Sequence, residues 1–215
     1  MKTLKLQNVP AVLVFVTWCT ALLIVCIGAP NNFWAEIDRR LTDLSAKDGI
    51  LLTLTPLISL IASGLFSPIV KAAIVFWRVR NVLPGHRAFS IHARADPRID
   101  LELLRKRVVP WPNDPAAENH IWYGLYRSVQ NAIQVVDAHR SFLLARDLTS
   151  IALTFIVVGA PTVLFVSSSA RWTLTYGLVA MLQYAIMALV ARNHGVRFVR
   201  NVLVEVSHQG GTSRA

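Results

Sequence analysis

The sequence predicts an all-α integral membrane protein with four transmembrane helices and a helical cytosolic insert between the second and third helices. Three observations carry this prediction: the composition, the apolar segments and the distribution of basic residues. Of the 215 residues, 54% are apolar and 16% are charged, with a mean hydropathy of +0.48. Soluble domains carry about a quarter charged residues, so this composition excludes an ordinary soluble domain.

Four apolar segments divide the chain. Each is about 19 residues or longer, which is enough to cross about 30 Å of hydrocarbon as a helix. They must be helical, because lipid offers no hydrogen-bond partner to the backbone of an open strand. They lie at about 10–28, 50–76, 148–167 and 172–191. The resulting division is an N-terminal membrane hairpin, a cytosolic insert, a C-terminal membrane hairpin and a cytosolic amphipathic tail, at 1–76, 77–147, 148–191 and 192–215.

The basic residues set the expected topology. If both termini and the insert face the cytosol, 18 Lys and Arg residues lie inside: 2 in the N-terminal tail, Lys71, 11 in the insert and 4 in the tail. Only 4 lie outside, at Arg39, Arg40, Lys47 and Arg171. This asymmetry follows the positive-inside rule and predicts a multi-pass membrane protein with both termini in the cytosol. It also accounts for the net charge of +10 without nucleic acid.

Two features of the N-terminal part bear on this topology. A cleavable signal peptide is an alternative for the first segment, because Lys2 and Lys5 precede it and "IGA" at 27–29 resembles a cleavage site. Between the first two segments, apolar residues share one helical face over about 32–47, which predicts an amphipathic helix on the outer surface or against the outer ends of the spans.

Inside the insert, two Asp-Pro pairs predict helix starts, because Asp caps a helix and Pro suits its first position. Asp96-Pro97 predicts a helix over 97–107, and Asp114-Pro115 predicts a second helix from Pro115. No stop signal follows Pro115 before Pro161, so the second helix is expected to run into the third membrane segment without a break. Pro84-Gly85 predicts a turn after the second segment, with a loop beyond it.

The second helix carries a heptad seam with a 3-4 spacing: Trp122, Leu125, Val129, Ala132, Val136, His139 and Leu143. Such a stripe needs another helix to cover it. The tail is expected to continue the fourth membrane helix, with Val196, Val199, Leu203 and Val206 on one face, and it is one candidate cover. A second copy of the chain is the other, so the seam predicts a homo-oligomer.

Arg87 and His92 form an Arg-x4-His pair, a spacing found in helical domains that cut RNA. The imidazole can transfer a proton and the guanidinium can hold phosphate oxygens, so this pair is the candidate catalytic site. Arg80 and His86 fit a similar spacing, and the composition alone supplies about 1.4 such matches, which weakens the catalytic interpretation. The alternative is that basic side chains after the turn bind lipid headgroups, namely Arg78, Arg80, Arg87 and Arg94.

Two spans, a helical cytosolic insert and two further spans resemble the small four-span membrane effectors and accessory proteins of bacterial antiviral systems. These include pore-forming effectors of nucleotide second-messenger systems and accessory membrane proteins of RNA-targeting CRISPR systems, some of which carry the Arg-x4–6-His motif matched here by Arg87 and His92. The resemblance covers the architecture of the whole chain. It implies an oligomeric pore or membrane-perturbing effector controlled through the cytosolic part.

The sequence favours neither a metal nor another cofactor. Cys19 and Cys26 are the only cysteines, and no zinc-ligand spacing is present. Expected partners are the lipid bilayer, further copies of the chain and a cytosolic protein. A nucleic-acid partner stays open, because "NHIWYGLYRSVQ" places rings beside Arg127. A small transporter or scaffold is a further alternative, although Gln183, the strongly polar residue deepest in a span, is expected to form an interhelical hydrogen bond instead.

Overall fold

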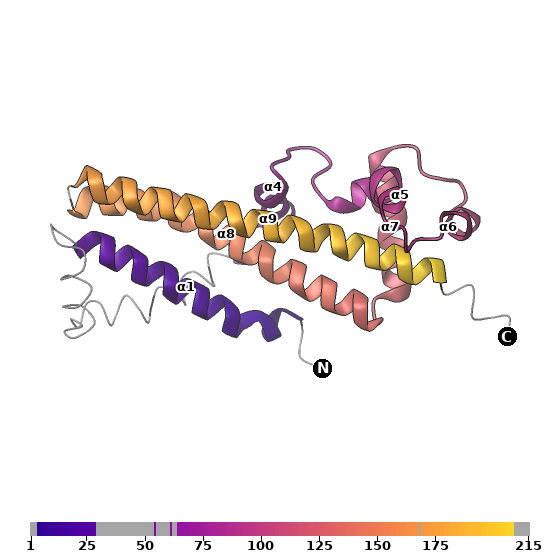
Figure 1. Ribbon diagram of the computed structural model, residues 1–215, viewed down its shortest axis with the longest axis horizontal. Coiled ribbons are helices and arrows are strands. Elements are labelled where there is room, and N and C mark those ends of the chain that lie inside the picture. The colour runs from indigo at the N-terminus through magenta and orange to yellow at the C-terminus, as the bar shows by residue number, and fades with distance from the viewer. Residues whose placement is uncertain (1–3, 29–53, 55–60, 62–63, 168, 209–215) are drawn as a thin grey trace. The chain divides into compact units, whose positions relative to one another are not determined.

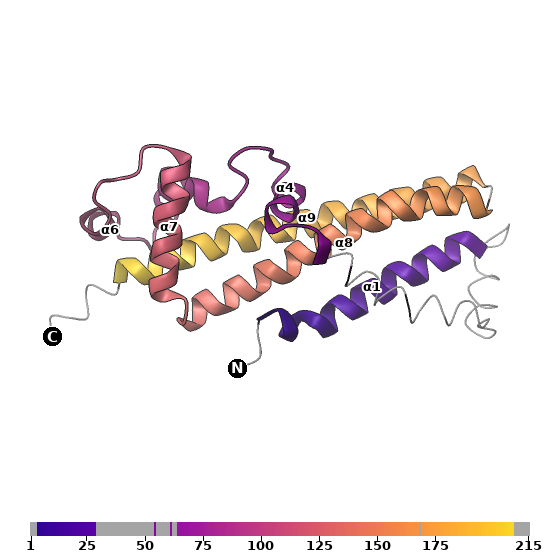
Figure 2. The same ribbon diagram turned by 180° about the vertical axis from the view of Figure 1, so that it is seen from behind.

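The computed structural model describes residues 4–28, 54, 61, 64–167 and 169–208, and this part of the chain is helical without any strand (Figure 1 and, seen from behind, Figure 2). The elements are α1 (Leu4–Gly28), α4 (Pro68–Phe76), the 3-10 helix η1 (Pro84–Arg87), the π-helix η2 (Ala88–His92), α5 (Ala93–Ala95), α6 (Leu101–Arg107), α7 (Pro115–Val129), α8 (Ile133–Ser167) and α9 (Ala170–His208).

Three of these helices are long and apolar enough to span a membrane: α1 over Leu6–Ile27, α8 and α9. The all-helical class is therefore confirmed for the described residues. The first, third and fourth apolar segments are confirmed as helices. Of the second segment, at 50–76, the structure describes residues 54, 61 and 64–76, which include α4; the rest of it and the whole surface helix expected at 32–47 lie outside the described residues. The count of four spans stays a prediction.

The chain forms two compact units. The first unit comprises Met1–Ser67 and Arg146–Ala188, and the second comprises Pro68–Ala145 and Leu189–Ala215. Each therefore holds part of α8 and part of α9, which are antiparallel because only residues 168 and 169 join them. Within each unit, the two helices supply a separate core.

The core of the first unit surrounds Tyr176 of α9, whose side chain is 1% exposed. Its hydroxyl donates a hydrogen bond of 2.8 Å to the carbonyl oxygen of Phe155 on α8. Gln183 of α9 donates to the sulfur of Cys19 on α1 across 3.0 Å, which confirms the expected interhelical bond. Cys19 and Cys26 are both buried and unbridged. The Tyr176 hydroxyl and the Gln183 amide thus each have a partner inside the unit, as an apolar surrounding requires.

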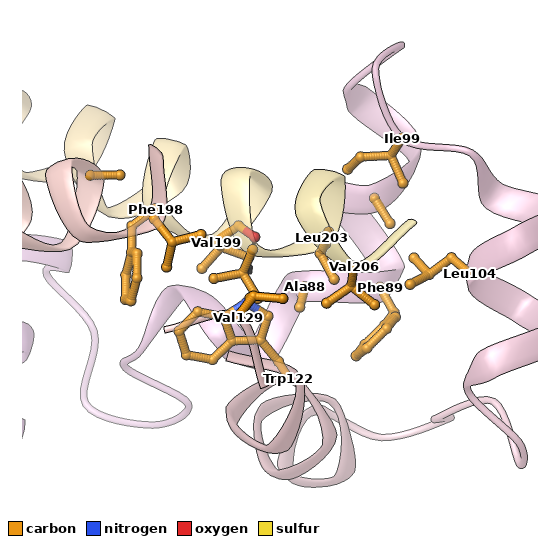
Figure 3. Packing of buried hydrophobic residues seen from close by; sticks show 14 of the residues in the cluster. Ala88, Phe89, Ile99, Leu104, Trp122, Val129, Phe198, Val199, Leu203 and Val206 are labelled. Carbon is orange, nitrogen blue, oxygen red and sulfur yellow. Dashed lines mark hydrogen bonds between the residues drawn. The ribbon is translucent and has the colours of Figure 1, made fainter. Parts of the chain in front are cut away.

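The core of the second unit lies where α7, η2 and α6 meet the C-terminal part of α9 (Figure 3). Trp122 of α7 packs edge-on against Phe198 of α9 with a centroid distance of 5.3 Å, and its Nε1 donates to the carbonyl oxygen of Val199 across 3.4 Å. The tail thus continues the fourth apolar segment as one helix and packs against the insert, as predicted. The buried residues of α9 in this core are Phe198, Val199, Val202, Leu203 and Val206.

The two Asp-Pro predictions have different outcomes. Asp114 caps α7, since its Oδ1 accepts from the amides of Ala116 and Ala117 at 2.9 and 3.0 Å. The helix predicted from Pro97 begins instead at Leu101, capped by Asp100. Asp96 does not cap this helix because its carboxylate pairs with Arg98. It forms an ion pair of 2.7 Å with the guanidinium group and accepts a hydrogen bond from the Arg98 amide.

Two other local predictions are wrong. The helix from Pro115 does not continue into the third membrane segment, because α7 ends at Val129 and α8 starts at Ile133. The segment holding Arg87 and His92 is not a loop, because η1, η2 and α5 form successive helical turns from Pro84 to Ala95. Tertiary packing overrides the turn that Pro84-Gly85 favours locally. Here η1 packs against α7 so closely that a Cβ on Gly85 would lie 2.5 Å from Asn119 Oδ1.

Candidate functional site

The second unit has a pocket of about 270 Å³ that we call the arginine pocket. Its polar lining comes from three separate segments of the chain: the residues after α4, the turns η1 and η2, and α9. These polar residues are Arg78, Arg87, His92 and Arg192, and the apolar walls are Phe76, Pro84, Ile91 and Val196.

The end of α4 positions Arg192. The amide of Trp77 closes the last turn by donating to the carbonyl oxygen of Ala73, and its φ of 52° ends the helix in the left-handed region. Arg192 Nε donates to the carbonyl oxygen of Val75 across 2.6 Å, and its guanidinium carbon lies 3.7 Å from the centroid of the Trp77 ring. A cation bound to the last carbonyls of a helix also stabilises the negative end of the helix dipole.

Arg87 approaches the pocket from η1. Its Nη1 donates to the carbonyl oxygen of Asn81 across 3.4 Å, and Asn81 has a φ of 49°, a conformation that Asn tolerates better than most residues. Arg87 is half-buried, whereas Arg78, which directly follows Trp77 in the chain, is exposed. The two guanidinium groups therefore keep donors available to a ligand.

His92 is 8% exposed, and its Nδ1 forms no hydrogen bond within the described part of the chain. Burial lowers the pKa of His92 to about 4, and the charges of Arg200 and Arg78 add to this effect, while the carboxylate of Glu118 opposes it. His92 is consequently neutral at pH 7, with one buried ring nitrogen that lacks a partner.

Glu118 of α7 holds η2 in place. Its Oε2 accepts hydrogen bonds from the amides of Phe89 and Ser90, at 2.8 and 3.0 Å. These amides open a helical turn, so they have no partner within that turn. Glu118 is only 4% exposed, and its two bonds fix the start of the element that carries His92.

The predicted seam is interrupted by the break between α7 and α8. Trp122 and Val129 are buried in the core of the second unit, with Leu125 packed beside them. Beyond the break the buried stripe shifts by one residue, to Val135, Ala138 and Phe142, and the seam positions Val136, His139 and Leu143 are half-buried. The seam is thus not one continuous stripe, and its first half is covered by α9 of the same chain.

His139 belongs to an aromatic cluster. Its ring stacks on Phe198 of α9 with a centroid distance of 4.6 Å and an interplanar angle of 6°. The hydroxyl of Tyr126 lies 3.2 Å from its Nδ1. Tyr126 and Trp122 stack on each other, so these rings of "NHIWYGLYRSVQ" pack inside the unit.

The structure regroups the predicted basic residues. Arg78 and Arg87 line the pocket together with His92, whereas Arg80 and Arg94 are exposed and do not line it. Sequence reasoning missed Arg192 and the nearby Arg200. The sequence does contain a sign that Arg192 is special. It lies four residues before Val196 and therefore on the apolar face of the tail helix. A buried-face arginine needs a specific partner.

Within the described residues, His, Cys, Asp and Glu do not gather into a group of three or more that could hold a metal ion. No model of a known protein family, no curated protein and no solved structure matches this chain. The chemistry of the site therefore rests on its own geometry: three guanidinium groups and a neutral imidazole around one recess suit an anion.

Acidification should destabilise the fold through His92. The unfolded chain protonates this group near pH 6.5 and the folded chain only near pH 4, so its contribution is complete above 6.5 and is lost as the pH falls towards 4. The whole difference corresponds to at most about 3 kcal/mol of unfolding free energy. We expect the melting temperature of the purified protein to fall between pH 7 and 4.5, and less steeply for His92→Gln. Equal slopes would contradict this assignment.

Proposed function

We propose that this chain is an oligomeric, multi-pass protein of the bacterial inner membrane that alters membrane permeability under the control of its second unit. The observation that carries the proposal is that α8 and α9 are each shared between the two units. In both units they contribute to the core, and α8 and α9 both contain a candidate membrane span. A stiff helix transmits a displacement at one end to the other, which is a common way to couple a ligand-responsive part to a membrane part.

The surface of the first unit supports insertion into lipid. Large apolar side chains on all three candidate spans are exposed, such as Trp18 on α1, Phe165 on α8 and Leu178 on α9, at 61%, 79% and 72%. A soluble protein rarely exposes so much contiguous apolar surface. The second unit instead has a closed core and a polar pocket, which suits the cytosolic side expected from the basic residues.

Expression in a bacterium tests the permeability proposal. The membrane potential, followed with a voltage-sensitive dye, is expected to fall on expression of the wild type. Trp122→Ala removes the ring that joins α7 to α9, so it should change this response while the protein stays in the membrane. The control is an unrelated multi-pass protein at the same level. The same potential in all three strains would contradict the proposal.

A membrane-anchored ribonuclease is a second candidate, and one observation favours it. Arg87 and His92 line the same pocket, and a neutral His92 can accept a proton. We nevertheless expect the purified wild type to show no RNA cleavage that depends on His92, because the composition alone supplies such pairs. RNA cleavage by the purified wild type that His92→Ala lacks would favour the ribonuclease instead.

A further inference from the structure

Positively charged side chains gather around the arginine pocket. Three arginines from separate segments converge on it, and none of the described residues that line it is acidic. Arg87 donates a hydrogen bond to the backbone carbonyl oxygen of Asn81, and Arg192 donates one to that of Val75. Arg200 acts on His92 as an additional nearby cation, and the carboxylate of Glu118, which does not line the pocket, opposes it. Such a concentration of like charge around a recess is costly unless an anion occupies it.

A second observation points into the same recess. His92 is more than nine-tenths buried, lines the pocket and has a ring nitrogen, Nδ1, that makes no hydrogen bond within the described part of the chain. A buried polar atom of this kind needs a partner. As a neutral imidazole it can offer an N–H to an anion's oxygen or accept a hydroxyl.

We infer that the arginine pocket binds the phosphate group of a small organophosphate, either the headgroup of an anionic phospholipid or a soluble mononucleotide. All three lining cations are arginines, whose planar fork matches two phosphate oxygens at once. The walls formed by Phe76 and Ile91 suit the uncharged part of the ligand. A volume of about 270 Å³ lies at the lower end for ligand sites, so one phosphate with a small attached group fits better than a dinucleotide.

A bound phosphate would join two parts of the second unit that are distant in sequence. Arg78 follows α4, whereas Arg192 belongs to α9, and the ligand would bridge them. Ligand binding should therefore stabilise the second unit. The inference goes beyond the proposed change in permeability, because binding to the purified protein is measured without any permeability readout.

The experiment uses the full chain in nanodiscs of neutral phosphatidylcholine. One arm titrates AMP and inorganic phosphate and follows the melting temperature and the heat of binding. The other arm adds phosphatidylglycerol and counts bound lipids by native mass spectrometry. The pocket variant is Arg78→Gln with Arg87→Gln. Its matched control is Arg80→Gln with Arg94→Gln, which removes the same charge from exposed arginines that do not line the pocket.

We expect the pocket variant to weaken binding about tenfold or more and the control to retain it within about twofold. Retention of phosphatidylglycerol alone would identify a lipid headgroup, and saturable binding of AMP or phosphate would identify a soluble ligand. Both results support the site. Ile91→Glu, at a side chain that is 50% exposed, places a carboxylate at the pocket without disturbing the core, and should weaken binding as well. No binding in either arm, or equal loss in pocket variant and control, would overturn the inference.

Discussion

Replacing Val129 with Asp should unfold the second unit. Val129 is 2% exposed and packs in the cluster that joins α7 to α8 and α9. A carboxylate at this position would lie among buried apolar side chains, so it must either stay charged in an apolar surrounding or force the core open. We expect a loss of about 4 kcal/mol or more in unfolding free energy. Thermal unfolding and hydrogen exchange over 115–145 would measure it.

Gln134→Asp is the matched control, because this side chain is exposed on the first turn of α8. We expect its effect to stay within about 0.5 kcal/mol. Val136→Asp, at a half-buried position, should fall between the two. These variants also separate two interpretations of the seam. A Val129→Asp protein that stays folded but dissociates into monomers in native mass spectrometry would show that the seam faces another subunit rather than α9 of its own chain.

The second large effect is expected for Glu118→Ala. The lost carboxylate leaves the amides of Phe89 and Ser90 without an acceptor, and Phe89 is fully buried. An unsatisfied buried donor costs about 1–3 kcal/mol, and Ser90 is exposed, so a loss of about 1–3 kcal/mol is expected from the Phe89 amide. Because η2 carries His92, phosphate binding should weaken too.

Glu118→Gln is the conservative comparison, since its amide oxygen can take the place of Oε2. It should retain most of the stability and keep the amides of Phe89 and Ser90 protected from hydrogen exchange. If Glu118→Ala leaves both melting temperature and exchange unchanged, these two hydrogen bonds do not hold η2 in place.

The sequence predicted the features that depend on local chemistry. Apolar runs of sufficient length predicted α1, α8 and α9, and Asp114-Pro115 predicted the start of α7. The prediction of one continuous helix from Pro115 was wrong, because the break at 130–132 contains neither Pro nor Gly to mark it in the sequence. It is a tertiary effect: α7 turns so that Trp122 packs on α9, and local propensity is too weak to prevent this. The predicted start of α6 was wrong because Asp96 and Asp100 can both cap a helix. The sequence does not reveal that Asp96 forms an ion pair with Arg98 instead.

The candidate site was predicted in part. Arg78, Arg87 and His92 were identified, because basic residues and histidines next to a membrane segment stand out in any sequence. That Arg78 and Arg87 line a pocket while Arg80 and Arg94 do not depends on the successive turns of η1 and η2. Arg192 lies 100 residues after His92 in the chain. Periodicity places it on the apolar face of the tail helix, but only the packing of that helix brings it to the pocket.

We propose that the chain crosses the membrane four times, with the insert at 77–147 and both termini in the cytosol. Reporter fusions at Ala46, Asn113 and Gly210 test it most directly, because Ala46 and Asn113 flank the predicted second span and must lie on opposite sides if that span crosses. We predict that Asn113 and Gly210 report the cytosol and Ala46 the periplasm, as the 18 to 4 division of Lys and Arg requires. A periplasmic signal from the Asn113 fusion, or the same side for Ala46 and Asn113, would contradict the account.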